Sequence, residues 1–354
     1  MAKKKSIDVD SDLIDLSQRT RDEIEKKYGT GVITNASSVI EVDREIISIC
    51  PTVDYAFHGG LTKGNWFVMN GPPKTGKSAL GLKALAKCQK NGMRTIFFNI
   101  EHRLKKRDML GVEGLDLDKL EIVQSVKGNI LSAEKSFNIL YDILSCDTNC
   151  AVLVDSFSVL NEEAKQTEYG KETRGKLGHY ASDFCNSVAS IVPLHDHIIM
   201  GITHSIANTS GMGPSKVEKS PNSIIYMSDF KMKCWKDTGW KWEDKEGERI
   251  GQKVSWECEF SGLGGGGRKV VSYLRYGIGY DELMEYMVYA EEFGLIAKAG
   301  SWFTLFPDEK LDPPIKSQGL EGIWTYLRNP ENKEPHDKLV KEVRELLGLP
   351  AIIL

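Results

Sequence analysis

Short apolar runs alternate with amphipathic stretches through the middle of the chain, and this pattern predicts an α/β fold. The apolar runs have the length and composition of buried strands, and helical spacing prevails between them. Strands that alternate with helices in this way build a mostly parallel, twisted sheet flanked by helices. The expected strands lie at residues 66–69, 94–100, 120–124, 150–155 and 197–203, and the expected helices begin at residue 77 and span 130–144 and 177–194.

The rest of the chain has different patterns. Apolar and polar residues alternate between residues 229 and 276, which is typical of antiparallel strands. Residues 16–28 carry charges on most faces and predict an exposed helix with little core of its own to join, so it would dock on a neighbouring subunit. Beyond residue 280 the sequence predicts a small α+β domain with helices at 281–293, 319–327 and 335–347 and a hairpin at 297–306.

These patterns predict three parts of the chain. They are an N-terminal docking arm (1–50), a core domain (51–280) and a C-terminal domain (281–354).

The stretch GPPKTGKS, residues 71–78, lies between a predicted strand and a predicted helix. This is the phosphate-binding P-loop in its required context, and the context favours it over an ordinary turn. Backbone N–H groups of such a loop surround nucleotide phosphates, Lys77 can reach the terminal phosphates, and the Ser78 hydroxyl can ligate Mg²⁺. We therefore predict that a nucleoside triphosphate is bound by Gly71, Pro72, Pro73, Lys74, Thr75, Gly76, Lys77 and Ser78.

Two acidic residues stand at the carboxyl ends of predicted strands, where the ligands of open parallel sheets collect. Asp155 closes the apolar run CAVLVD, which is the Walker B pattern of a carboxylate that holds Mg²⁺. Glu101 follows the strand at 94–100 and is the candidate for polarising an attacking water, although a solvated carboxylate in a turn is the alternative. The P-loop and these carboxylates together predict hydrolysis of the nucleotide.

The composition of the chain favours a globular protein and disfavours a membrane protein. Hydrophobic residues make up 41% and charged residues 27% of the chain, which is typical of a globular protein, and the formal net charge of −4 disfavours a whole-molecule electrostatic nucleic-acid binder. The cysteines show neither CxxC pairs nor zinc-site spacing, which indicates reduced thiols in a cytosolic compartment. No apolar run approaches the ~18 residues of a membrane-spanning helix, so no membrane partner is expected.

Two polar stretches with glycines, residues 161–176 and 205–222, follow predicted strands. Long loops at such positions are usually functional. Acidic side chains offset most of the basic ones in both stretches, so any DNA contact that they make would be weak per subunit and would gain strength through assembly.

Several stretches, in order along nearly the whole chain, resemble the RecA family of strand-exchange recombinases, which includes bacterial RecA and phage UvsX. They are residues 23–33, 53–78, Glu101-His102, LVDS at 153–156 and, most specific of all, 276–303. The resemblance implies a DNA-dependent ATPase that forms a helical filament on single-stranded DNA and catalyses homologous pairing and strand exchange in recombination and repair. It also implies ATP and Mg²⁺ as cofactors and the cytoplasm of a bacterial or phage-infected cell as location. The implied partners are single- and double-stranded DNA, further copies of the chain, and single-strand-binding and loader proteins.

The family motifs can be carried over residue by residue. Lys77 and Glu101 match catalytic positions, and Ser78 and Asp155 match the nucleotide and metal positions. His204 stands where the family has a glutamine that senses the γ-phosphate, and the charge of a histidine would make the coupling to DNA pH-sensitive. The two polar stretches match the DNA-binding loops, with candidate contacts at Lys171, Arg174, Lys176, Ile206, Met212, Lys216 and Lys219.

The chain departs from the family pattern in three places, one of which is that it ends in LLGLPAIIL in place of an acidic tail. A basic run at 103–107 replaces the family's aspartate and tyrosine beside the adenine. The basic pair that crosses the subunit interface in the family falls in the uncharged FSGLGGGG at 260–267, with Arg268 and Lys269 as candidate substitutes.

Two alternative functions stay open at this point. One is another RecA-fold motor, which the N-terminal arm and C-terminal domain disfavour. The other is a non-hydrolysing filament, which Glu101 disfavours.

Overall fold

The computed structural model describes residues 9–40, 44–161, 176–208, 216–244, 246–309 and 313–352, and of residues 9–17, 39, 40 and 216 the backbone alone. The chain divides into two compact units, Met1–Glu45 and Ile46–Leu354. The first unit holds helices α1 (Val9–Tyr28) and α2 (Ala36–Ile40). Helix α1 contains the expected helix at 16–28 and ends as expected at Gly29, whose backbone N–H donates to Glu25 O (2.9 Å).

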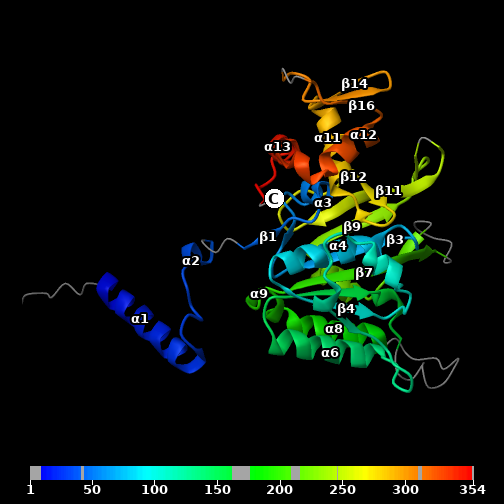
Figure 1. Cartoon of the computed structure of the whole chain (residues 1–354). Helices are drawn as coiled ribbons and strands as arrows, with labels where there is room; N and C mark the ends of the chain where they lie inside the picture. Colours follow the sequence, from blue (N-terminus) through cyan, green and yellow to red (C-terminus); the bar gives the residue numbers. More distant parts are fainter. Residues whose placement is uncertain are drawn as a thin grey trace, which may run out of the picture. The chain divides into compact units, whose positions relative to one another are not determined.

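The second unit contains one large sheet with the strand order β13-β12-β11-β9-β3-β7-β6-β4-β5 (Figure 1). From β9 to β5 all neighbours are parallel, which confirms the predicted parallel core, and beyond β9 the pairing is antiparallel, as the alternation after residue 229 predicts. The strands of the parallel part are β3 (Trp66–Gly71), β4 (Arg94–Asn99), β5 (Leu120–Val123), β6 (Cys150–Asp155), β7 (Ile198–Ala207) and β9 (Phe230–Trp235). Those paired antiparallel are β8 (Lys216–Lys219), β10 (Lys241–Glu243), β11 (Arg249–Ser261), β12 (Lys269–Arg275) and β13 (Gly279–Tyr280).

The pairing registers bring the carboxyl ends of four parallel strands together. Gly71, the last residue of β3, pairs with His204 of β7, and Asn99, the last residue of β4, pairs with Asp155 at the end of β6. Because ligands of open α/β sheets bind outside the carboxyl ends of the strands, this edge is where a nucleotide is expected.

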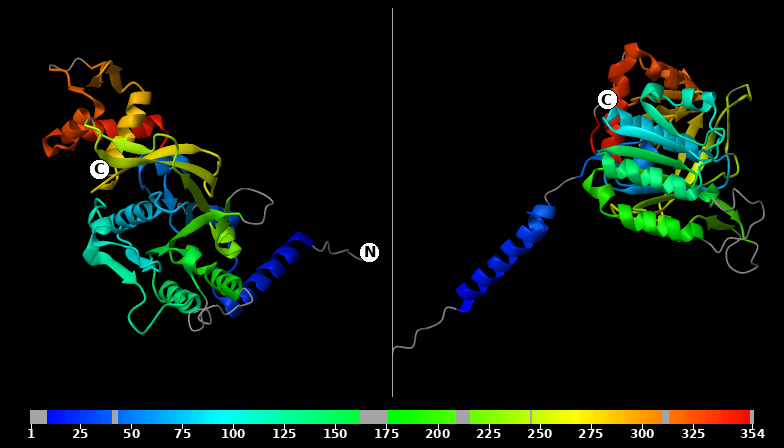
Figure 2. Two further views of the ribbon diagram at one scale, coloured as in Figure 1. Left: turned by 90° about the vertical axis from the view of Figure 1, so that its right-hand side faces the viewer. Right: turned by 90° about the horizontal axis from the view of Figure 1, so that it is seen from below.

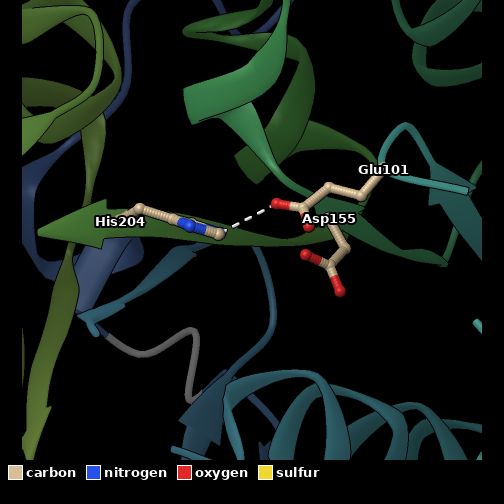
Figure 3. A group of neighbouring side chains, drawn as sticks. All are labelled: Glu101, Asp155 and His204. Atoms are coloured by element: carbon tan, nitrogen blue, oxygen red, sulfur yellow. Dashed lines mark ion pairs between the residues drawn. The ribbon is translucent and has the colours of Figure 1, made fainter. Parts of the chain in front are cut away.

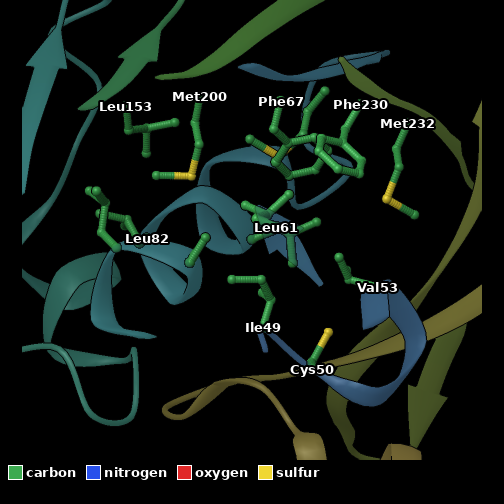
Figure 4. Packing of buried hydrophobic residues seen from close by; sticks show 14 of the residues in the cluster. Ile49, Cys50, Val53, Leu61, Phe67, Leu82, Leu153, Met200, Phe230 and Met232 are labelled. Carbon is green, nitrogen blue, oxygen red and sulfur yellow. The ribbon is translucent and has the colours of Figure 1, made fainter. Parts of the chain in front are cut away.

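Helices cover both faces of the parallel sheet. Side chains alternate along β3, so that Phe67 and Met69 join one hydrophobic cluster with α3 and α4 (Figure 4), whereas Val68 joins a second cluster with α6 and α8. Helices α6 and α8 pack against each other on the face opposite α4 (Figures 1 and 2). The bounds are α3 (Pro51–Ala56), α4 (Lys77–Lys90), α6 (Ala133–Cys146) and α8 (Lys176–Val188).

The chain after residue 280 has a hydrophobic core of its own. The hairpin expected at 297–306 is confirmed by the antiparallel pairing of β14 with β15. A buried ion pair between Arg344 and Asp54 (2.8 Å) connects α13 to α3. The part boundaries at residues 50 and 280 stay predictions. The elements here are α11 (Glu282–Glu292), β14 (Ile296–Ala299), β15 (Trp302–Leu305), β16 (Lys316–Gln318), α12 (Leu320–Arg328) and α13 (Lys333–Leu346).

The expectation of one polar loop over residues 205–222 is wrong in part. Strand β7 continues through Ala207, β8 pairs antiparallel with it, and α10 begins at Asn222. Residues 204–207 pair with residues 216–219, and the Ser158 hydroxyl donates to Lys219 O (2.5 Å), which polar composition alone does not reveal. The other expected loop, 161–176, falls almost entirely outside the described residues, and α8 begins at its last residue, Lys176.

The helix expected at 177–194 is interrupted, because α8 ends at Val188 and α9 (Ile191–Leu194) is separate.

No helix of the described chain is long and apolar enough to span a membrane. The remaining elements are β1 (Ile46–Ile47), β2 (Leu61–Thr62), α5 (Lys106–Leu110) and α10 (Asn222–Met227), with 3₁₀ turns η1 (Leu117–Lys119), η2 (Phe157–Val159) and η3 (Pro330–Asn332).

Candidate functional site

The P-loop between β3 and α4 needs its first and last glycines. A Cβ at Gly71 would lie 2.5 Å from the Cys234 sulfur, and a Cβ at Gly76 would lie 2.7 Å from the Tyr280 hydroxyl oxygen. Gly76 also has a φ of +94°, a conformation that L side chains rarely adopt. The loop therefore keeps its tight course against β9 and β13 only with glycine at both positions.

Lys77 is the first residue of α4, and its side chain folds back over the loop. Its ammonium nitrogen donates to Gly71 O (2.9 Å) and Pro72 O (2.7 Å), and the residue is only 5% exposed. Burial lowers the pKa of Lys77 below its usual value, while nearby Cys234, Asp155 and Glu101 act in the opposite direction. The two carbonyl oxygens therefore hold the partly desolvated Lys77 ammonium beside the loop backbone.

Ser78 and Asp155 form a second contact at the start of α4. The Ser78 hydroxyl donates to Asp155 Oδ2 at 2.6 Å. Burial raises the pKa of Asp155, and the hydrogen bond from Ser78 opposes that rise. A hydroxyl and a carboxylate oxygen side by side are the hard oxygen ligands that Mg²⁺ prefers.

Glu101 lies beyond β4 and meets His204 across the site. His204 Nε2 is 2.9 Å from Glu101 Oε1 (Figure 3). The Ser156 hydroxyl donates to the same oxygen at 3.0 Å. The hydrogen bond from His204 is the largest cause that lowers the pKa of Glu101 below its usual value. Ligand atoms of Glu101, Asp155 and His204 all lie within 4.8 Å of one another. Glu101 is thus held as a carboxylate next to the Asp155 oxygens.

A cavity of about 820 Å³ opens over these residues. This volume lies within the usual range for ligand pockets. Its lining runs from the P-loop, Glu101 and Asp155 to the basic run at 103–107. No sequence motif marks the wall that the antiparallel strands and the turn after β12 supply, so it was not predicted; it consists of Gln252, Leu274, Arg275, Tyr276, Gly277 and Gly279.

The predicted DNA contacts are only partly within the described residues. Ile206 is 45% exposed, and Lys176 and Lys219 are exposed as well. Lys216 is described by its backbone in β8 alone, and Lys171, Arg174 and Met212 lie outside the described residues. Contact of any of these side chains with DNA stays a prediction.

Arg268, a candidate for reaching across a subunit interface, is engaged within its own chain. Its guanidinium lies 4.5 Å from the centroid of the Tyr55 ring, and its NH1 donates to Tyr55 O. Lys269 lies at the start of β12. Arg268 would have to leave Tyr55 before it met a neighbouring nucleotide.

Comparison with known proteins identifies the family. Residues 16–201, more than half of the chain, match the RecA N-terminal domain. The RecA protein of Xanthomonas axonopodis pv. citri (strain 306) is 26% identical over 329 residues, which cover 91% of each chain. That of Aquifex aeolicus (strain VF5) is 26% identical over 334 residues, or 92% of this chain and 91% of the relative, and that of a Nitratiruptor species is 25% identical over 335 residues, or 92% of each. The chain therefore belongs to the RecA family, whose members are nucleotide-using, DNA-dependent ATPases that form filaments and exchange DNA strands.

Proposed function

We propose that this protein hydrolyses ATP at the carboxyl ends of β3, β4, β6 and β7 and uses the ATP-bound state to hold a strand-exchange filament on single-stranded DNA. The observation that carries the proposal is the arrangement of Lys77, Ser78, Asp155 and Glu101 around one cavity, on the strands that open α/β folds use for nucleotides. Exchange of one duplex for another is nearly balanced in base-pair energy, so the protein need only align the strands and then release them.

Ser78 and Asp155 fit the Mg²⁺ that accompanies ATP. Their oxygens are 2.6 Å apart, and Asp155 is kept partly desolvated, where a cation would stabilise its ionised form. Bound there, Mg²⁺ would neutralise charge on the β- and γ-phosphates. Lys77 would exchange its carbonyl contacts at Gly71 and Pro72 for phosphate oxygens.

Glu101 and His204 would act as a pair. Glu101 would orient the attacking water and accept its proton, and His204 would donate to the γ-phosphate. When His204 turns to the phosphate, Glu101 loses the hydrogen bond that lowers its pKa and becomes a stronger base. Water attack would thus depend on the arrival of the γ-phosphate. The same movement of His204 would reach the β7–β8 hairpin, since His204 belongs to β7 and pairs with Lys219 of β8.

The DNA site and the partners are also proposals. We place DNA contacts on residues 161–176 and 205–222, with exposed Lys176, Ile206 and Lys219 among them. Single-strand-binding and loader proteins are the expected partners, and the cytoplasm of a bacterial or phage-infected cell is the expected location. The arm at residues 1–50 would dock on the next copy in the filament.

The test is ATP hydrolysis and strand exchange by the full chain. ATP turnover should require Mg²⁺ and rise on addition of single-stranded DNA, and a fluorescent duplex should lose its labelled strand to a homologous filament but not to a heterologous one. ATP turnover that ignores DNA, with no homology-dependent exchange, would contradict the proposal.

A further inference from the structure

A chain of polar side chains runs from the P-loop strand to the β7–β8 hairpin. Asn70 Nδ2 donates to Thr203 Oγ1 (2.9 Å), and Thr203 Oγ1 donates to Glu218 Oε1 (2.6 Å). The Ser205 hydroxyl donates to Asn70 Oδ1 (2.7 Å). Asn70 is 3% exposed and Thr203 is fully buried, so the bond between them is shielded from water, whereas the bonds to Glu218 and Ser205 are partly buried. Thr203 Oγ1 is the branch point of this chain, because it accepts from Asn70 on β3 and donates to Glu218 on β8.

The second oxygen of Glu218 continues the chain toward β9 and β11. Lys231 Nζ lies 2.8 Å from Glu218 Oε2 and 2.8 Å from Glu259 Oε2. The Lys231 side chain is only 9% exposed, and such a desolvated ammonium is stable only while its carboxylate partners stay in place. Burial acts to lower the pKa of Lys231, but the hydrogen bonds to Glu218 and Glu259 outweigh it and raise the pKa.

These contacts lie on one face of β7 and the Glu101–His204 pair lies on the other. Successive side chains of a strand point to opposite faces, so Thr203 and Ser205 share a face that His204 does not. Asn70 immediately precedes Gly71, whose carbonyl oxygen accepts a hydrogen bond from Lys77. The polar chain therefore touches the phosphate loop by a route that does not pass through His204.

We propose that Glu218 and Lys231 are positioning residues that couple the phosphate loop to the β7–β8 hairpin, through Thr203 and Asn70. The proposal rests on the proposed function, in which the hairpin carries the second DNA loop and ATP raises the affinity for DNA. Among the described strands β8 pairs only with β7, and the Glu218 side chain connects it directly to Lys231 on β9. Through Thr203 and Lys231 the same side chain is connected to Asn70 on β3 and Glu259 on β11. A shift of the phosphate loop on nucleotide binding moves Asn70, and the relay passes that shift to β8.

The experiment measures the affinity of the full chain for a fluorescein-labelled oligo(dT), without nucleotide and with Mg²⁺ and the slowly hydrolysed analogue ATPγS. The ratio to compare is the dissociation constant without nucleotide divided by the dissociation constant with ATPγS, which is the gain in DNA affinity that the nucleotide produces. Thr203→Val removes the hydroxyl that joins Asn70 to Glu218, and Lys231→Met leaves two carboxylates facing each other. We expect each variant to lower the ratio by at least about fivefold, the lower end of typical allosteric couplings.

Matched controls separate coupling from general damage. Lys231→Arg keeps the cation and should retain the wild-type ratio. Lys233→Met makes the same change as Lys231→Met at an exposed position of the same strand and should also retain it. Affinity for ATPγS and turnover without DNA should stay within about threefold of wild type in Thr203→Val, because the hydrogen bonds of the Thr203 hydroxyl go to Asn70 and Glu218 and not to Lys77, Ser78, Glu101 or Asp155. If Lys231→Met does not fold, as judged by circular dichroism, Thr203→Val carries the test.

The outcomes distinguish this proposal from the function on which it rests. A wild-type ratio in folded Thr203→Val, with the wild-type protein itself showing an ATPγS-dependent gain, overturns the relay and leaves the function standing. A wild-type protein with no such gain overturns both. A lowered ratio in Thr203→Val, with Lys233→Met unaffected, supports the relay, because a merely structural role would weaken DNA binding equally with and without nucleotide.

Discussion

Glu285 provides a stability prediction whose size follows from the structure. It lies on α11, is 1% exposed, and its Oε2 accepts a hydrogen bond from the Thr52 backbone N–H (3.1 Å) on α3. Burial raises the pKa of Glu285 from 4.5 to about 7. Below about pH 4.5 the carboxyl is protonated in both folded and unfolded chains, whereas between about 4.5 and 7 it is ionised only when unfolded. The unfolded state then binds fewer protons, so the free energy of unfolding falls as the pH rises through this window.

The perturbation is Glu285→Gln, which imitates the protonated side chain at every pH. A difference of roughly 2.5 pH units, at 1.36 kcal/mol each, gives about 3 kcal/mol. The variant should therefore gain about 3 kcal/mol relative to wild type between pH 4.5 and pH 8. The assay is urea unfolding at several pH values, followed by tryptophan fluorescence.

Glu282→Gln on the same helix is the control, with the opposite sign. Burial acts to raise the pKa of Glu282, but Lys87 and Lys83 outweigh it and lower the pKa. The stabilisation by its ionised form is present above the unfolded pKa and is lost as the pH falls through the lower folded pKa. Glu282→Gln should thus cost most at neutral pH and least in acid. A stability difference between wild type and Glu285→Gln that does not change with pH would show that folding does not raise the pKa of Glu285.

Three further predictions concern the nucleotide site. Lys77→Ala should abolish ATP binding, because the ammonium is the main positive charge beside the P-loop; isothermal titration that returns wild-type affinity would exclude this role. His204→Ala should keep ATP binding but lower the ATP-induced gain in single-stranded DNA affinity by about 5- to 150-fold, the usual range of allosteric coupling, as measured by fluorescence anisotropy; an unchanged gain would contradict it. Removal of Mg²⁺ with EDTA should stop turnover, and turnover that persists in excess EDTA would disprove the metal requirement.

The nucleotide site could be located from the sequence because each of its parts follows a local rule. The P-loop is contiguous and lies between a strand and a helix. Glu101, Asp155 and His204 are distant in sequence, but each lies at or near the carboxyl end of an apolar strand, and the parallel registers of β3, β4, β6 and β7 bring such positions together. Periodicity and topology therefore predicted that Glu101 and Asp155 lie beside the P-loop, whereas the role of His204 was implied by the resemblance to the RecA family.

Three features could not be predicted from the sequence, namely the far wall of the cavity, strand β8 and the contact of Arg268 with Tyr55. They depend on antiparallel registers and side-chain directions that no motif encodes. Tyr276 reaches the cavity only because β11 and β12 extend the sheet from β9. The stretch 205–222 contains few apolar residues, so the hydrophobic pattern could not predict strand β8 within it. Glu218 of β8 forms an ion pair with the buried Lys231, which that pattern does not reveal either. Arg268 was an interface candidate on charge and position, and the aromatic ring of Tyr55 that holds it comes from a segment far away in the sequence.

The role of Glu101 as the base that activates water can be tested by the DNA-stimulated ATP turnover of Glu101→Gln. Loss of a positioned base should lower turnover on the order of 10² or more while ATP and single-stranded DNA binding persist, and filaments on DNA should then outlast those of wild type. Glu113→Gln, a change of the same kind at an exposed carboxylate that pairs with Arg328, is the control and should turn over ATP normally. Wild-type turnover by Glu101→Gln would show that another group activates the water and would contradict the assignment of this site.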